Sequence, residues 1–162
     1  MQRRHFIVAG LAFCVVPAYA QGMVVPKPGP KDLCPVCGMI VSKYPNWIAV
    51  VVWKDGHAHF FDGAKDMFKF LFDLAKYAPG HKREDITGIH VTDFYNLERV
   101  DARRAWFVTG SDVLGPMGHE FVPLATREDA DDFFKEHKGK QLLTFAQVTP
   151  EMPDALDAGR FK

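Results

Sequence analysis

The sequence predicts an α+β protein with two small ββαβ-like halves, antiparallel or mixed sheets and a preceding cysteine-rich knuckle. Short runs rich in Val, Ile, Phe and Trp, bounded by turn residues, indicate strands. Two segments, 64–77 and 127–137, carry apolar residues at helical spacing. Each helical segment follows strands and precedes a returning strand, an order typical of α+β architecture. The two units indicate a pseudo-repeat, although the sequence shows no strict repeat.

Composition fits one soluble globular protein. The 162 residues are 48% hydrophobic and 25% charged, values typical of a chain that buries a sizeable core. The 20 basic and 20 acidic residues give a formal net charge of zero. Because no basic face or stripe is visible, we expect no nucleic-acid partner.

The N-terminus predicts a signal peptide over residues 1–20. Arg3 and Arg4 form a positive n-region, 6–16 form a short apolar stretch, and 18–20 (Ala-Tyr-Ala) fit the cleavage rule. The apolar stretch is too short to cross a bilayer comfortably. We therefore expect export to the periplasm with a mature start at Gln21, and the paired arginines leave open the twin-arginine or the general route.

Lipid anchoring is not expected from this leader. Cys14 could mark a lipoprotein signal, but Phe13 stands where such signals require a small residue. Removal of the leader leaves a mature net charge of −2 and only two cysteines, Cys34 and Cys37.

The mature chain begins with an extended linker over 21–33, which contains three prolines. The first half, 34–94, starts with the Cys-Pro-Val-Cys-Gly-Met motif of residues 34–39. Its expected elements are a buried strand at 47–53, an Asp-Gly turn at 54–56, a strand at 57–61, a helix at 64–77 and a strand at 86–94. Asp62 is the expected N-cap of the helix, and Asp66 is a favourable charge in its first turn.

The second half, 95–148, repeats this order. Its expected elements are strands at 97–100, 104–109 and 120–124, a loop at 110–119, a helix at 127–137 with Thr126 as N-cap, and a strand at 141–148. The tail, 149–162, contains two prolines and is expected to fray, with at most a turn near 153–158.

The motif of residues 34–39 places two thiols and a thioether close together. Cys34, Cys37 and Met39 are soft donors, and soft donors select Cu(I) above other metals. A structural knuckle with a buried Met, or a disulfide in an oxidising compartment, fits the same spacing. The motif alone does not decide among these interpretations.

A second thioether stands in the loop of residues 114–120. Most Met residues fill cores, but Met117 is flanked by Gly and Pro and has no apolar periodicity around it. His119 adds an imidazole two positions later. His57 and His59 share one face of a predicted strand and could form a Cys₂His₂ zinc site with the two thiols, but a polar hairpin face is the favoured interpretation of this pair.

These segments together resemble the NosL family of accessory proteins of bacterial nitrous oxide reductase. The resemblance rests on residues 34–39, 44–47 and 60–68, and on residues 115–123 before the second helix. It implies Cu(I) binding, supply of copper to the multinuclear centre of the reductase, and two similar ββαβ-type halves related to those of an organomercurial lyase. No group in the sequence requires a catalytic role, so we expect no enzymatic activity.

Residue by residue, the resemblance makes Cys37 and Met117 the expected copper ligands. Cys34, His119 and Met39 are further candidates. Implied partners are the reductase or its maturation machinery, with a membrane-associated partner and a metal-bridged homodimer left open. Many family members are lipoproteins, and this leader departs from that pattern.

Three alternatives stay open. One is a periplasmic binding module with an incidental disulfide and no metal preference, and the other two give the thiols a function. A thiol-disulfide oxidoreductase would use Cys34 and Cys37, but its motif should follow a strand and open a helix. Here a Pro/Gly-rich linker precedes the motif. A structural zinc protein would instead need the metal in order to fold.

Overall fold

The computed structural model describes residues 25–161, and the predicted signal peptide with Cys14 lies outside the described residues. The strands are β1 (Ala49–Trp53), β2 (Ala58–Phe61), β3 (Ile86–Thr92), β4 (Arg99–Asp101), β5 (Trp106–Thr109), β6 (Val122–Leu124) and β7 (Gln141–Thr144). The α-helices are α1 (Ala64–Phe72), α2 (Leu74–Tyr77), α3 (Arg127–Glu136) and α4 (Met152–Asp157). Short 3-10 turns cover Val41–Lys43, Arg83–Asp85 and Phe145–Gln147.

Two sheets share one connectivity. Their strand orders are β2-β1-β3-β4 and β6-β5-β7, and the described pairs are all antiparallel. In the first sheet β1 lies between β2 and β3, the strand that follows α1 and α2. In the second sheet β5 lies between β6 and β7, the strand that follows α3. This arrangement confirms the α+β class, while β4 extends the first sheet by one short strand.

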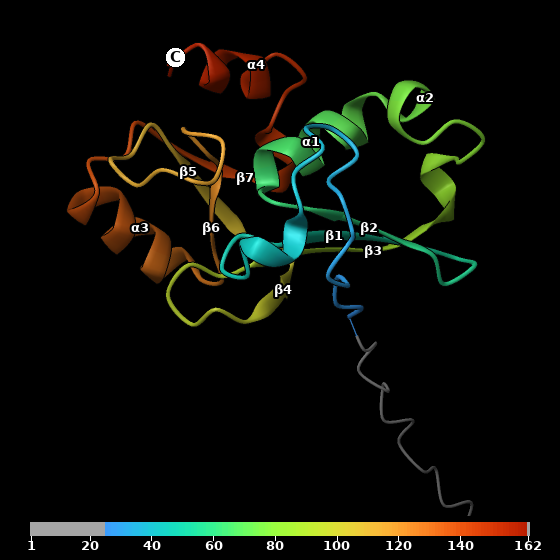
Figure 1. Cartoon of the computed structure of the whole chain (residues 1–162). Helices are drawn as coiled ribbons and strands as arrows, with labels where there is room; N and C mark the ends of the chain where they lie inside the picture. The colour runs from blue at the N-terminus through green and yellow to red at the C-terminus, as the bar shows by residue number, and fades with distance from the viewer. Residues whose placement is uncertain (1–24, 162) are drawn as a thin grey trace, which may run out of the picture.

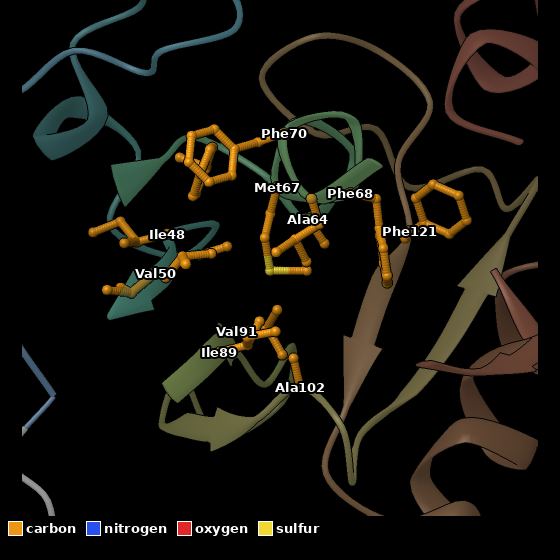
Figure 2. Close-up of a cluster of buried hydrophobic side chains, with 14 of the residues drawn as sticks. Ile48, Val50, Ala64, Met67, Phe68, Phe70, Ile89, Val91, Ala102 and Phe121 are labelled. Carbon is orange, nitrogen blue, oxygen red and sulfur yellow. The ribbon is translucent and has the colours of Figure 1, made fainter. Parts of the chain in front are cut away.

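Helix α1 lies over the first sheet (Figure 1), and its Phe68 also contacts Phe107 and Phe121 of the second half. Figure 2 shows Met67 pointing from α1 toward the strands that carry Val50 and Val91, and Phe68 facing Phe121 of the second half. The ring centroids of Phe68 and Phe121 are 5.1 Å apart. One buried cluster therefore runs through both halves, and the position of α1 is fixed by both sheets.

Helix α3 covers the second sheet on its own side (Figure 1). Its predicted N-cap is confirmed, because the Thr126 hydroxyl accepts a hydrogen bond from the Asp129 N–H at 3.0 Å. Ala130 and Phe133 are buried against a smaller apolar cluster that includes Val108. The second half thus has a satellite core of its own.

Two predicted elements are interrupted by local side-chain hydrogen bonds. The helix predicted over 64–77 breaks at Asp73, whose carboxylate accepts a hydrogen bond from the Lys76 N–H at 3.1 Å and starts α2. The strand predicted over 141–148 ends at Thr144, whose N–H donates to the Gln147 side chain at 2.8 Å. In both places a side chain close in sequence competes with the regular backbone pattern.

The tail also differs from its prediction, because it does not fray. It forms α4, which buries Leu156 and packs against α1. Lys69 of α1 pairs with Asp154 at 3.4 Å and also with Asp157. Within residues 25–161, no helix is both long enough and apolar enough to span a membrane.

Candidate metal centre

Residues 34–39, hereafter the Cys loop, form a tight turn. The Cys34 N–H donates to the Met39 carbonyl at 2.9 Å, and the Gly38 N–H donates to the Cys34 carbonyl at 2.9 Å. Gly38 has a φ of +77°, which favours a residue without a Cβ. This turn returns the chain on itself and presents both thiols to the start of α1.

Two carboxylates receive these thiols. The Cys34 Sγ donates to Asp66 Oδ2 at 3.3 Å, and the Cys37 Sγ donates to Asp62 Oδ1 at 3.1 Å. One ligand atom from each of the four residues lies within 4.8 Å of the others. Both cysteines are free thiols, so the disulfide interpretation does not describe this structure.

Burial and the two carboxylates hold both thiols in the protonated form. Burial raises the pKa of Cys34 far above its ordinary value, and the charges of Asp66 and Asp62 add to the shift. Burial, followed by hydrogen bonds to Asp66 and Asp62, raises the pKa of Cys37 to about 12. Each thiol must therefore lose a proton before it can act as a thiolate ligand.

Asp62 does not cap α1, and that prediction was wrong. The N-cap is Gly63, and Asp62 is instead held by the Cys37 thiol. The acceptor for the helix start comes from the other half of the chain, because buried Glu120 Oε1 accepts from the Lys65 N–H at 2.5 Å. The same oxygen accepts from the Phe121 N–H at 2.9 Å. Asp66 does lie in the first turn, as predicted.

Residues 114–120, hereafter the Met loop, reach the same helix turn. Gly115 and Gly118 close the tip of the loop with reciprocal backbone hydrogen bonds of 2.8 and 3.1 Å. The Lys65 Nζ donates to the Met117 carbonyl at 3.0 Å, while the Met117 residue is 46% exposed. Residues 62–66 therefore contact both the Cys loop and the Met loop.

The remaining predicted donors occupy different settings. His119 has a buried Nδ1 without a hydrogen-bond partner, and its ring stands edge-on to Phe161 with centroids 4.7 Å apart. Met39 is half-buried, and its carbonyl closes the Cys loop. The assignment of Cys37, Met117, Cys34, His119 and Met39 as copper ligands stays a prediction.

The histidine pair belongs elsewhere. His57 and His59 have ring centroids 4.8 Å apart and cluster with His81 beside Trp53. The Trp53 Nε1 donates to His59 Nδ1 at 2.8 Å, and burial lowers the pKa of His59 to about 4. Among the described residues, the clustered metal-ligand set contains no histidine, so a Cys₂His₂ site is not formed.

Sequence reasoning missed four residues around these loops. Asp62 and Asp66 were interpreted only as helix-start residues, and Lys65 and Glu120 were given no role. One signal was present, because Asp62 and Asp66 are four positions apart at a helix start, a spacing that places side chains on one face. The contacts of Lys65 and Glu120 link distant parts of the chain, which local patterns do not reveal.

Comparison with known proteins agrees with this architecture. The crystal structure of the copper chaperone NosL from Shewanella denitrificans aligns with a TM-score of 0.64 and 25% sequence identity, covering 77% of this chain and 95% of that one. No curated protein matches the chain significantly. The model of the NosL family matches residues 25–153, which include both loops and both sheets. The chain belongs to the NosL family.

Proposed function

We propose that this protein is an exported Cu(I) metallochaperone that supplies copper to the multinuclear centre of nitrous oxide reductase. One observation carries the proposal: residues 62–66, at the start of α1, contact both the thiol-bearing Cys loop and the thioether-bearing Met loop. Membership in the NosL family supports it. The structural neighbour from Shewanella denitrificans, described as a copper chaperone, supports it as well.

The donor set suits a soft cargo ion. Cys34 and Cys37 offer thiolates, and Met117 offers a thioether that is partly open to solvent. Thiolate and thioether ligands select Cu(I). A thioether on an exposed loop tip remains accessible to an incoming donor of the acceptor protein, so cargo can leave by ligand exchange.

Competition between protons and copper for the two sulfurs makes copper binding reversible. Two thiolates beside Asp62 and Asp66 would concentrate negative charge in a buried place, and protons on the thiols remove that cost. A copper ion that binds the sulfurs displaces those protons. Cargo and protons therefore compete for the same atoms, and the competition limits the affinity at neutral pH.

The thiol-disulfide oxidoreductase alternative has less support. A redox-active thiol needs a lowered pKa so that its thiolate can attack a disulfide. The pKa values of Cys34 and Cys37 are raised. The Cys loop is followed by a short 3-10 turn rather than by the helix that such an active site opens. We therefore propose no catalytic role.

Structural zinc binding is the second candidate, because Asp62 and Asp66 stand with the two thiols. Two thiolates and two carboxylates could enclose Zn²⁺ in a closed four-ligand site. That site would not use Met117. The two candidates are therefore separated by the effect of the Met117 side chain on metal binding.

The test is an anaerobic titration of the mature protein with Cu(I) against a competing chelator, and a parallel titration with Zn²⁺. The variants are Cys37→Ser and Met117→Leu, with Met152→Leu as a matched thioether control in α4. We expect tight Cu(I) binding that both site variants weaken and the control leaves unchanged. Zinc binding that restores folding after chelation, with Cu(I) binding insensitive to Met117→Leu, would replace the proposal by a structural zinc site.

The copper acceptor, the oligomeric state and the export of the protein need separate experiments. Copper-loaded protein is mixed with copper-free nitrous oxide reductase, and metal content and restored activity of the reductase are measured. We expect transfer from the wild type and loss of transfer with Cys37→Ser.

Light scattering with and without copper tests a metal-bridged homodimer. N-terminal sequencing of the protein from periplasmic extracts tests the predicted cleavage before Gln21.

A further inference from the structure

Lys65 is an unusual residue for its place in the fold. Its side chain is only 1% exposed, although it lies in the first turn of α1. Lysine is almost never fully buried unless a partner compensates its charge. Lys65 has two such partners from distant parts of the chain: its Nζ donates to the Met117 carbonyl at 3.0 Å and pairs with Asp157 Oδ1 at 2.7 Å.

These contacts join three segments at one ammonium group. Lys65 belongs to α1, Met117 to the Met loop and Asp157 to α4. Figure 1 shows α4 lying next to α1 in the region where the chain ends. The C-terminal helix, which begins where the family match ends at residue 153, is thereby connected to the loop that carries the thioether.

The Met loop depends on such an anchor. The Met117 residue is 46% exposed, so burial does not fix the place of its thioether. Gly115 and Gly118 close the tip of the loop. Two hydrogen bonds attach the loop to α1: the Lys65 Nζ donates to the Met117 carbonyl, and the Lys65 N–H donates to the Glu120 carboxylate. The ammonium thus acts on the residue that bears the thioether.

We propose that Lys65 is the positioning residue of the Met loop and that Asp157 orients its ammonium group. Lys65 holds the Met117 carbonyl at the first turn of α1, where Asp66 accepts a hydrogen bond from the Cys34 thiol. A lysine side chain has a long flexible stem, and the carboxylate of Asp157 selects the conformation that reaches the loop. The inference rests on the proposed function, because the contact matters for metal binding only if Met117 is a ligand.

Lys69 provides a matched control. It lies on the same helix one turn later and pairs with the same Asp157, but among the described contacts its ammonium group reaches α4 and not the Met loop. Asp154 is the corresponding control for Asp157, because within residues 25–161 its ion pair is with Lys69 and not with Lys65. The variants are Lys65→Leu against Lys69→Leu, and Asp157→Asn against Asp154→Asn.

The readout is Cu(I) affinity by anaerobic competition, with thermal unfolding measured in parallel. Loss of a residue that orients a metal ligand weakens metal binding by about 10- to 100-fold. We expect about that loss for Lys65→Leu, a smaller loss for Asp157→Asn, and changes of less than about twofold for the two controls. Asp157→Asn leaves the Lys65 residue unsubstituted, so it tests the inference if Lys65→Leu does not fold.

A double-mutant cycle with Met117→Leu separates positioning from a general effect of the positive charge. If Lys65 acts through the thioether, Lys65→Leu has no further effect on Cu(I) affinity once Met117 is Leu. Additive losses, or equal losses for Lys65→Leu and Lys69→Leu, would overturn the inference. Failure of the wild type to bind Cu(I) would instead overturn the proposed function, so the two failures are distinguishable.

Discussion

The Cys37 thiol donates a hydrogen bond to the Asp62 carboxylate across 3.1 Å, from the Cys loop to the residue before the N-cap of α1. The contact joins a soft donor to a hard, charged acceptor. Burial and this carboxylate both favour the protonated thiol, with burial the larger effect. A metal that binds Cys37 must therefore overcome a proton that the fold itself retains.

Cu(I) affinity should rise with pH. Because the pKa of Cys37 is about 12 and that of Cys34 is raised as well, each thiolate formed at neutral pH releases one proton. The apparent association constant then rises by up to about tenfold per pH unit for each thiol that binds. Competition titrations between about pH 6 and 8.5, corrected for protonation of the chelator, measure this slope. A flat profile would contradict thiolate ligation.

Asp62→Asn should make Cys37 more reactive. The substitution removes a negative charge that disfavours the thiolate, so the pKa of Cys37 falls toward its ordinary value. In a Cys34→Ser background, alkylation of Cys37 at about pH 8 should become several-fold faster. Asp73→Asn, which removes a carboxylate that caps α2, is the control and should leave the rate unchanged. An equal acceleration in both variants would point to loosening of the fold.

Local chemistry allowed much of the fold to be predicted. The Asp-Gly turn before β2 forms with Gly56 at a φ of +84°, and the Thr126 cap starts α3 as expected. The continuous apolar run of β1 predicted a buried strand, and every residue of that strand is buried. Each of these features depends on residues that are neighbours in sequence, or on the burial of one short segment.

The site was less predictable because its contacts cross the chain. Glu120 accepts from the Lys65 N–H over a separation of 55 residues, and this contact displaced Asp62 from the expected capping role. The docking of α4 depends in part on a pair between Lys69 and Asp157, 88 residues apart. Sequence patterns identified the thiols and Met117, but not the charged residues that hold their loops in place.

Gly63→Ala should damage the junction between the two loops. A Cβ at this N-cap would lie 2.1 Å from Glu120 Oε2 and 3.0 Å from its Cδ, so the buried carboxylate must move. Overpacking of this kind costs about 1–3 kcal/mol of unfolding free energy, and displacement of Glu120 also releases the Lys65 N–H. Chemical denaturation and Cu(I) titration measure the two effects.

Gly29→Ala is the control for Gly63→Ala, because a Cβ at Gly29 meets only an ordinary contact, 3.6 Å from Asp32 Oδ2. We expect Gly29→Ala to leave both stability and copper affinity close to those of the wild type. Unchanged stability in Gly63→Ala would show that Glu120 is free to move, contrary to its buried and doubly hydrogen-bonded position.

Glu120→Gln should change how stability depends on pH. Burial raises the pKa of Glu120 to about 8, above its ordinary value of 4.5, although Lys65 opposes the shift. A raised folded-state pKa means that the unfolded chain loses this proton first as pH increases. The stability present below about pH 4.5 is therefore lost progressively until the folded state also deprotonates near pH 8.

The effect of Glu120 on stability is best measured between about pH 6.5 and 8. Below it, His59 has the opposite effect, because its pKa is lowered from 6.5 to about 4 and stability rises as the unfolded histidine loses its proton. Within the window, Glu120 should reduce the unfolding free energy of the wild type by about 1–2 kcal/mol. Glu120→Gln keeps an oxygen acceptor for the Lys65 and Phe121 N–H groups but cannot titrate. Urea denaturation across this window should show that the stability of the wild type falls with pH, while that of Glu120→Gln changes less. An equal dependence of stability on pH in the two proteins would mean that Glu120 is already ionised in the folded protein at pH 6.5.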